Sequence, residues 1–151
     1  MRKINKQAGF TLIELIMVIV ILGVLSAFAL PRFADLGGSA RAATINGVAG
    51  SMKAAANIAH AQQLANGASG STAVVLEGVT ITMANGYPDD AGILLAAQIS
   101  STEFTTSTAG IVQAIGSVTP ANCQATYNEA TSAGTPAVIT AASVGIDVSD
   151  C

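Results

Sequence analysis

The sequence predicts an α+β protein in which a long N-terminal helix packs on an antiparallel β-sheet. Its N-terminal part holds a continuous apolar run and then an apolar stripe at spacings of three and four residues, which is the helical period. Its C-terminal part instead has short β-rich runs separated by glycine, asparagine and proline. Helix first and strands afterwards is a pattern typical of α+β folds.

The apolar run follows a short basic leader, residues 1–9, which carries Arg2, Lys3 and Lys6. Between residues 10 and 30, Glu14 is the only ionisable side chain. At about 1.5 Å per residue this stretch spans roughly 30 Å, the hydrocarbon thickness of a bilayer. We therefore expect a membrane-spanning helix whose basic end stays in the cytoplasm.

Glu14 calls for a partner, because an acidic side chain in a membrane helix costs up to about 3 kcal/mol at the bilayer centre and less near the interface. Cleavage after Gly9 would give Phe10 a free amine about 6 Å, one helical turn, from the Glu14 side chain. The amine of the same subunit or of a neighbour would then supply the opposite charge. A plain membrane anchor with an interfacial Glu14 is the alternative.

A secretory signal is a second alternative. Ala27-Phe28-Ala29 has the A-x-A form of a signal cleavage site, which would release a soluble protein beginning at Leu30. Against it, the apolar run is longer than the usual signal core of about 7 to 15 residues, and Glu14 would be unusual inside one.

The helical pattern continues beyond Pro31, which predicts a kink or an end because proline lacks an N–H and clashes with the preceding turn. We predict one helix over residues 10–64, whose first half is the membrane-spanning run and whose second half is amphipathic. A head over residues 65–151 would follow it. Gly23 and other glycines weaken this helix by about 1 kcal/mol each relative to alanine. The apolar stripe of the second half consists of Ile45, Val48, Met52, Ala55 and Ala59.

The head begins after a loop at residues 66–71. Two β-like runs flank Glu77-Gly78, which predicts a hairpin over residues 73–83. Alternating Val144, Ile146 and Val148 predict a half-buried strand, with residues 137–141 pairing nearby in a sheet of about four strands. The short apolar runs at 93–99 and 110–115 fit a helix or a strand, and periodicity does not decide between them.

The two cysteines, Cys123 and Cys151, both lie in the part predicted to be exported, where disulfides persist. We expect one bridge, closing a loop over residues 123–151. Its chain-entropy contribution is roughly 3.5 kcal/mol, which is large for a small head.

Charge and residue types argue against several functions. Without the leader, three basic and nine acidic side chains remain, a net charge near −6, and no Lys or Arg follows Lys53. Such a head repels phosphate backbones, so direct nucleic-acid binding is not expected. The single histidine, His60, has no acid or nucleophile at a helical spacing, and no metal-ligand or phosphate-loop motif occurs. We expect no enzyme, no cofactor and no metal site.

The stretch Gly9-Phe10-Thr11-Leu12-Ile13-Glu14-Leu15, followed by the apolar run and Pro31, resembles the class III leader and N-terminal helix of type IV pilins. This resemblance implies the type IV pilin fold, cleavage after Gly9 by a prepilin peptidase and N-methylation of Phe10. It implies that Glu14 pairs with the terminal amine of an adjacent subunit and sets the filament register. It further implies unwinding from Gly23 through Pro31 in the filament, and a variable loop closed by the C-terminal disulfide.

The resemblance is closer to one subgroup, the mannose-sensitive haemagglutinin (MSHA) pilins, whose filaments mediate surface attachment. It rests on Pro31-Arg32-Phe33, Ala40-Arg41, the helix over residues 47–60, and Glu77-Gly78 with Asn85-Gly86-Tyr87-Pro88. It implies a structural subunit that polymerises with copies of itself, assisted by an inner-membrane platform and an assembly ATPase.

The protein would reside first in the inner membrane of a Gram-negative bacterium and then in an extracellular pilus. A pseudopilin of a type II secretion system shares the N-terminal motif and is the main alternative.

Overall fold

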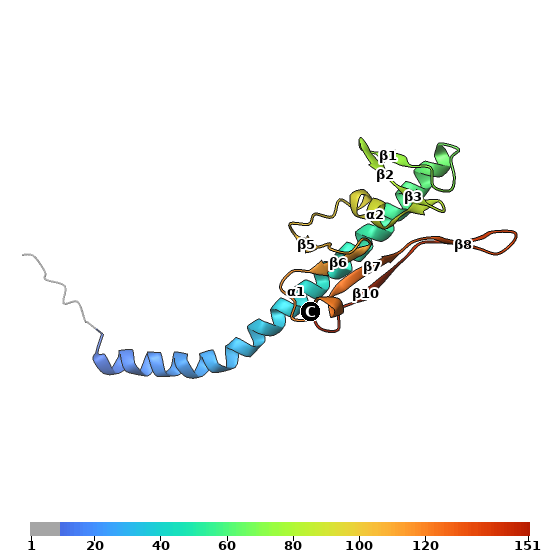
Figure 1. Ribbon diagram of the computed structural model, residues 1–151. Coiled ribbons are helices and arrows are strands. Elements are labelled where there is room, and N and C mark those ends of the chain that lie inside the picture. Colours follow the sequence, from blue (N-terminus) through green and yellow to red (C-terminus); the bar gives the residue numbers. More distant parts are fainter. Residues whose placement is uncertain (1–9) are drawn as a thin grey trace, which may run out of the picture. The chain divides into compact units, whose positions relative to one another are not determined.

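The computed structural model describes residues 10–151, apart from the side chains of residues 30–35. The leader, with Gly9, lies outside the described residues. The chain divides into two compact units, Met1–Gly37 and Gly38–Cys151. A single helix, α1 (Leu12–Ala65, 54 residues), contributes to both (Figure 1).

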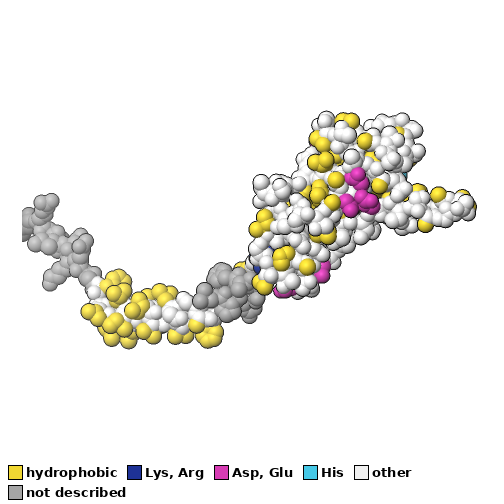
Figure 2. Space-filling model, viewed as in Figure 1, with side chains coloured by type: hydrophobic (Ala, Val, Ile, Leu, Met, Phe, Trp, Pro, Cys, Tyr) yellow, Lys and Arg dark blue, Asp and Glu magenta, His cyan; other side chains and the backbone are white. Residues whose placement is uncertain are grey.

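In the N-terminal unit, the part of α1 before residue 30 has apolar side chains around its whole circumference, with Glu14 near its start as the one charged residue. Over Leu12–Ala29 it is long and apolar enough to cross a membrane, and none of these residues is buried within the chain. Figure 2 shows apolar side chains along this part of the helix. A helix that is apolar on all sides needs lipid or other helices around it. The helix is continuous through Gly23 and Pro31; the unwinding expected there concerns an assembled filament and stays a prediction.

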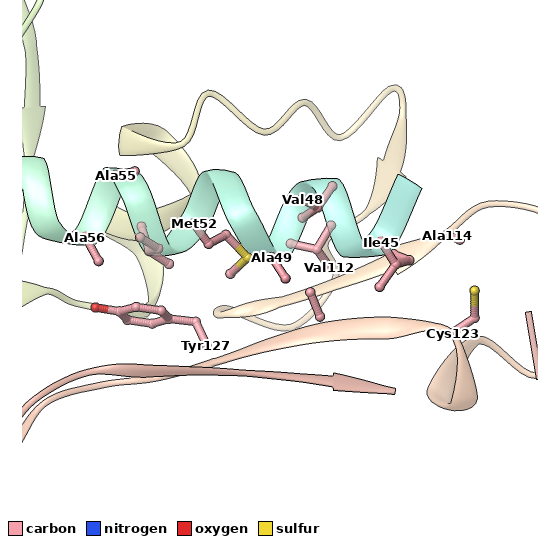
Figure 3. Packing of buried hydrophobic residues seen from close by; sticks show 12 residues of the cluster. Ile45, Val48, Ala49, Met52, Ala55, Ala56, Val112, Ala114, Cys123 and Tyr127 are labelled. Carbon is pink, nitrogen blue, oxygen red and sulfur yellow. The ribbon is translucent and has the colours of Figure 1, made fainter. Parts of the chain in front are cut away.

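The C-terminal part of α1 forms one wall of the head's core (Figure 3). The predicted apolar stripe is confirmed, since each of its members is less than a tenth exposed: Ile45, Val48, Met52, Ala55 and Ala59. Opposite them lie Val112, Ala125 and Tyr127 from the sheet. The expected α+β fold, a long helix packed on antiparallel strands, is therefore confirmed.

The predicted hairpin is also confirmed. Strand β1 (Val74–Leu76) pairs antiparallel with β2 (Val79–Ile81) around Glu77 and Gly78, whose φ angles are 50° and 84°. Two positive φ angles in a row give a turn whose twist matches that of the strands. Asn85 and Gly86 also have positive φ angles, 50° and 91°. They form the turn of a shorter hairpin between β3 (Met83–Ala84) and β4 (Tyr87–Pro88).

The two ambiguous apolar runs adopt different structures. The first contributes to helix α2 (Asp90–Ala96), where the Asp89 side chain caps the start by accepting a hydrogen bond from the Gly92 N–H at 2.6 Å. The second contains strand β6 (Ile111–Ala114), half of whose residues are buried. Tertiary packing decides here, because both runs are too short for periodicity to assign.

The main sheet has four antiparallel strands in the order β10-β7-β6-β5. Its members are β10 (Ser143–Asp147), β7 (Gln124–Asn128), β6 and β5 (Phe104–Thr105). The strand count agrees with expectation, but the membership differs. The hairpin over residues 73–83 stays outside this sheet. Within residues 137–141, strand β9 (Val138–Thr140) pairs with β8 (Thr131–Ala133) in a separate hairpin.

Strand β7 was not predicted, although it lies between two partners in the sheet. Its sequence, Gln-Ala-Thr-Tyr-Asn, alternates correctly but buries a small and an aromatic residue, Ala125 and Tyr127. The short 3₁₀ turn η1 (Pro120–Asn122) precedes it. A single alanine and a single tyrosine make a weak apolar signal, so only the neighbouring strands identify it.

Gly92 provides a test of the packing of α2. A Cβ atom at this position would overlap the backbone oxygen of Thr82. We expect Gly92→Ala to lower the free energy of unfolding by about 1–3 kcal/mol, because backbone must move to admit the methyl group. Urea unfolding followed by tyrosine fluorescence measures it, since both tyrosines lie in the head and tryptophan is absent.

Gly47 is the matched control for this substitution. It lies on an exposed position of α1, and an added Cβ would meet no atom within 4 Å. Gly47→Ala should therefore stabilise the helix by up to about 1 kcal/mol. Equal unfolding midpoints for the two variants would contradict the close approach at Gly92.

Candidate assembly site

The start of α1 is closed by reciprocal hydrogen bonds between Thr11 and Glu14. The Thr11 N–H donates to Glu14 Oε2 at 2.8 Å, and the Glu14 N–H donates to Thr11 Oγ1 at 3.3 Å. The Thr11 hydroxyl also donates to Oε2, at 2.7 Å. This is a capping box, which satisfies two of the backbone donors that a helix start leaves unpaired. Sequence analysis missed it, although the T-x-x-E spacing was visible.

Glu14 thus has a role within its own helix that needs no terminal amine. Both donors use Oε2, and an ionised carboxylate has two oxygens with about four acceptor positions. The side chain is exposed, so Oε1 is open to a donor from another chain. Capping and pairing with an amine are compatible at this residue.

Phe10 lies just before α1 in non-helical backbone, and nine-tenths of its surface is exposed. The bond expected to be cut joins it to Gly9, which lies outside the described residues. Cleavage there would leave Thr11 and Glu14 in place, and with them the capping box. Cleavage, methylation of Phe10 and the register role of Glu14 stay predictions.

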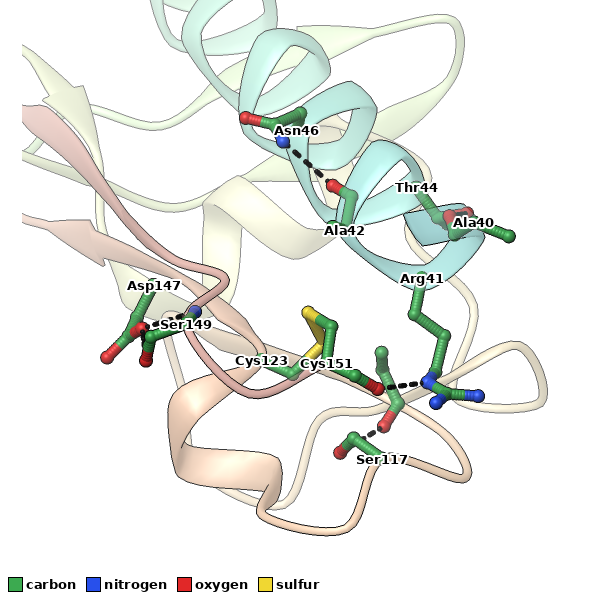
Figure 4. The surroundings of a disulfide bond; sticks show 11 residues. Ala40, Arg41, Ala42, Thr44, Asn46, Ser117, Cys123, Asp147, Ser149 and Cys151 are labelled. Atoms are coloured by element: carbon green, nitrogen blue, oxygen red, sulfur yellow. Dashed lines mark hydrogen bonds between the residues drawn. A yellow bond between two sulfur atoms is a disulfide. The ribbon is translucent and has the colours of Figure 1, made fainter. Parts of the chain in front are cut away.

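The predicted disulfide between Cys123 and Cys151 is present, with the Cα atoms 4.8 Å apart (Figure 4). Cys123 is fully buried in the core. Arg41 Nε donates a hydrogen bond to the backbone oxygen of Cys151 at 2.5 Å. Residue 151 is therefore held twice within the head, once to the turn before β7 and once to α1. The contact with Arg41 was not visible in the sequence, because it joins residues 110 positions apart.

His60 has a packing role. Its ring stacks on that of Tyr87 with the centroids 4.2 Å apart, and Nδ1 donates to the Gly86 carbonyl at 2.5 Å. One turn further along α1, Gln63 is fully buried, and its amide donates to the carbonyls of Gly70 and Thr72. These contacts join the end of α1 to the β3–β4 hairpin and to the loop before β1.

Three acidic side chains gather near the start of α2. Glu129 accepts a hydrogen bond from the Asp90 N–H at 2.6 Å, and Asp89 is the neighbouring cap residue. Burial raises the pKa of Asp90, and the charges of Glu129 and Asp89 raise it further. Among residues 10–151, no group of three His, Cys, Asp or Glu side chains has an arrangement that could hold a metal ion.

The raised pKa of Asp90 predicts a pH dependence of stability. Protonation favours the folded state, so the contribution is fully present below the unfolded pKa of about 3.9 and is lost as pH rises through the folded value. Asp90→Asn removes this titration. We expect the stability of the wild type relative to Asp90→Asn to fall as pH rises from about 3.5 to 6, measured by urea unfolding at each pH. A difference that grows with pH would contradict the assignment.

The N-terminal region is similar to known proteins. Residues 4–30 match the family described as the prokaryotic N-terminal methylation motif. The chain is 47% identical over 57 residues to the type IV narrow pilus major component PilA5 of Thermus thermophilus. This match covers 38% of the chain and 49% of the relative, so the chain matches only about half the length of that protein. No solved structure matches. The chain therefore carries the prokaryotic N-terminal methylation motif and is similar, over 57 residues, to a type IV pilin.

Proposed function

We propose that this chain is the structural subunit of a type IV pilus. The observation that carries the proposal is the methylation motif over residues 4–30 at the start of a 54-residue helix, in which Leu12–Ala29 is apolar and has no residue buried within the chain. The apolar side chains of such a helix need to be covered, either by the lipid of a membrane or by copies of the same helix. The similarity to a pilus component supports the same conclusion.

The proposed sequence of events follows from the helix. The chain inserts as a single-pass protein with its basic leader in the cytoplasm. A prepilin peptidase cuts after Gly9 and methylates Phe10, and the apolar helices then move from lipid into the filament core. Lipid is as apolar as the helices, so the gain on assembly comes from close packing and from charge pairing. Glu14 supplies that charge pair with the amine of Phe10.

Surface attachment belongs to the proposal as well, with motility as a further activity of such filaments. The resemblance to MSHA pilins, on which this part of the proposal rests, lies in the sequence features above. The partners are other copies of the chain, the peptidase, and the platform and ATPase of a pilus machine in the inner membrane of a Gram-negative cell. The filament itself would lie outside the cell.

Two other functions give different outcomes. A type II secretion pseudopilin would share the processing but form no long surface fibres. A secreted protein cut after Ala29 would appear in the medium without fibres.

The intact mass of protein sheared from cell surfaces tests the proposal. We expect a chain from Phe10 to Cys151 that carries one added methyl group and lacks two hydrogens until it is reduced. A chain beginning at Leu30 in the medium would refute the proposal. Correctly processed protein that never leaves the cell envelope would favour the pseudopilin.

A further inference from the structure

The β8–β9 hairpin lies outside the main sheet, and Ile139 and Ala141 line a hollow that they share with the end of α1. We call residues 130–142 the arm; Figure 1 shows its strands projecting beyond the sheet. All six of its strand residues are exposed. They include Val138 and Ile139, which are 66% and 49% exposed. A two-stranded hairpin without a covering layer is marginally stable in water at best, so an arm of this kind is expected to gain a covering layer from another chain.

The arm is nevertheless held firmly at its base. The Asn85 side chain donates a hydrogen bond to the Ala130 carbonyl at 2.8 Å, and strand β10 follows the arm directly into the main sheet. Successive strand residues point to opposite faces, so Val138 and Ile139 present an apolar side chain on each face. The arm thus has a defined position but uncovered apolar surface.

A complementary surface lies elsewhere on the head. We call it the groove: a hollow of about 490 Å³ between α1, the β1–β2 hairpin and α2. Ile58, Val79 and Leu95 come from these three elements, line the groove, and are 58%, 45% and 52% exposed. Leu76, Ile81 and Ala96 complete its apolar wall, and the polar side chains of Glu77 and Gln98 lie at the same hollow. Large apolar side chains gathered in one hollow are typical of a contact surface.

We propose that the arm of one subunit docks in the groove of a neighbouring copy in the filament. This proposal rests on the proposed function. Charge favours this pairing over other contacts between heads. From Gly38 onward the chain has seven acidic side chains against Arg41 and Lys53, so heads repel one another. Residues 130–146 carry no charge at all, and the arm can therefore approach an acidic head without that repulsion.

The symmetry of the contact also fits a polymer. Arm and groove are different surfaces, so each subunit offers one of each and the contact can repeat without limit. A heterologous contact of this kind generates rings or helical filaments, whereas a groove packed on a second groove would stop at a dimer. The arm would then link heads at the filament surface, while the apolar helices pack in the core.

Val138→Asp tests the proposal. Val138 is the better target, because Ile139 also lines a second hollow within its own head. Burying a new carboxylate against the apolar side chains of the groove, beside the charge of Glu77, should reduce the amount of sheared filament on the order of tenfold, with the level of processed protein unchanged. The matched control is Val118→Asp, which is 88% exposed and lies outside the arm; it should leave filament yield unchanged. Normal filaments from Val138→Asp would overturn the proposal.

A cysteine pair tests the contact directly. In filaments from Val138→Cys combined with Leu95→Cys, we expect a ladder of covalent multimers that collapses on reduction. Each single variant should give only monomer, as should Val118→Cys combined with Leu95→Cys. Filaments without the ladder would refute the arm contact and leave the pilin function standing. A wild type that forms no surface filaments would instead refute the proposed function.

Discussion

Glu14→Gln is expected to abolish most filament assembly while leaving insertion and cleavage intact. Glutamine keeps the length of the side chain and can replace glutamate in a capping box, so α1 should still begin at the same residue. What it removes is the negative charge. If Glu14 neutralises the Phe10 amine of a neighbour inside an apolar core, the variant leaves that amine unpaired at a cost of about 3 kcal/mol per contact.

The measurement is the amount of sheared filament relative to processed protein in the membrane. A cost of that size corresponds to roughly a hundredfold in an association constant, so we expect filament yield to fall at least about tenfold. Thr11→Ala is the matched control, because it removes the hydroxyl from the capping box and keeps the Glu14 charge. Its cost should be about 1 kcal/mol in helix stability, with filaments still formed.

These two variants separate the roles of Glu14. Loss of filaments with Glu14→Gln but not with Thr11→Ala would assign assembly to the charge. Loss with both would assign it to the helix start. Normal filament numbers with Glu14→Gln would show that no charge pair is needed and that Glu14 acts through capping alone.

Removing the disulfide is expected to produce the largest loss of stability in the head. The variant in which Cys123 and Cys151 are both alanine frees a loop that the bridge closes over 28 residues of sequence separation. The chain-entropy estimate for a loop of this length is about 3.5 kcal/mol. Since a small domain has only about 5–15 kcal/mol in total, the loss would amount to between about a quarter and about two thirds of its stability.

Urea unfolding of the full-length chain in detergent, followed by tyrosine fluorescence, measures this loss. Cys151→Ala should be close in stability to reduced wild type, because both lose the cross-link and keep the fully buried Cys123 side chain in the core. Cys123→Ala should be somewhat less stable, because Cys123 is fully buried and its truncation also removes packing. An unfolding midpoint that reduction leaves unchanged would contradict a stabilising role for the bridge.

Cys151 offers a second contact that the same measurement can resolve. Arg41 donates to its backbone oxygen, and the alanine variants keep that oxygen. If this hydrogen bond by itself kept residue 151 on the head, loss of the disulfide would lower the free energy of unfolding by much less than the chain-entropy estimate predicts. The size of the effect therefore distinguishes the two restraints.

The features that the sequence determined by itself are those with local physical causes. Three such features depend only on neighbouring residues: the apolar length before residue 30, the stripe from Ile45 to Ala59 and the Glu77-Gly78 turn. The structure confirms the helix, its buried face and the hairpin. The cysteine pair was also accessible, because Cys123 and Cys151 are the only two cysteines. The Thr11–Glu14 capping box is local as well, and the sequence contained the signal that was overlooked.

The remaining features depend on contacts between distant residues, and only the tertiary structure decided them. Strand β7 exists because β6 and β10 supply its hydrogen bonds, since its own apolar content is weak. Residues 137–141 were expected to pair within the main sheet, yet they pair in the arm, outside it. The groove joins side chains from three elements that no sequence window contains. Local periodicity states which face of a segment is apolar, whereas the identity of the surface that covers this face depends on the packing of the whole head.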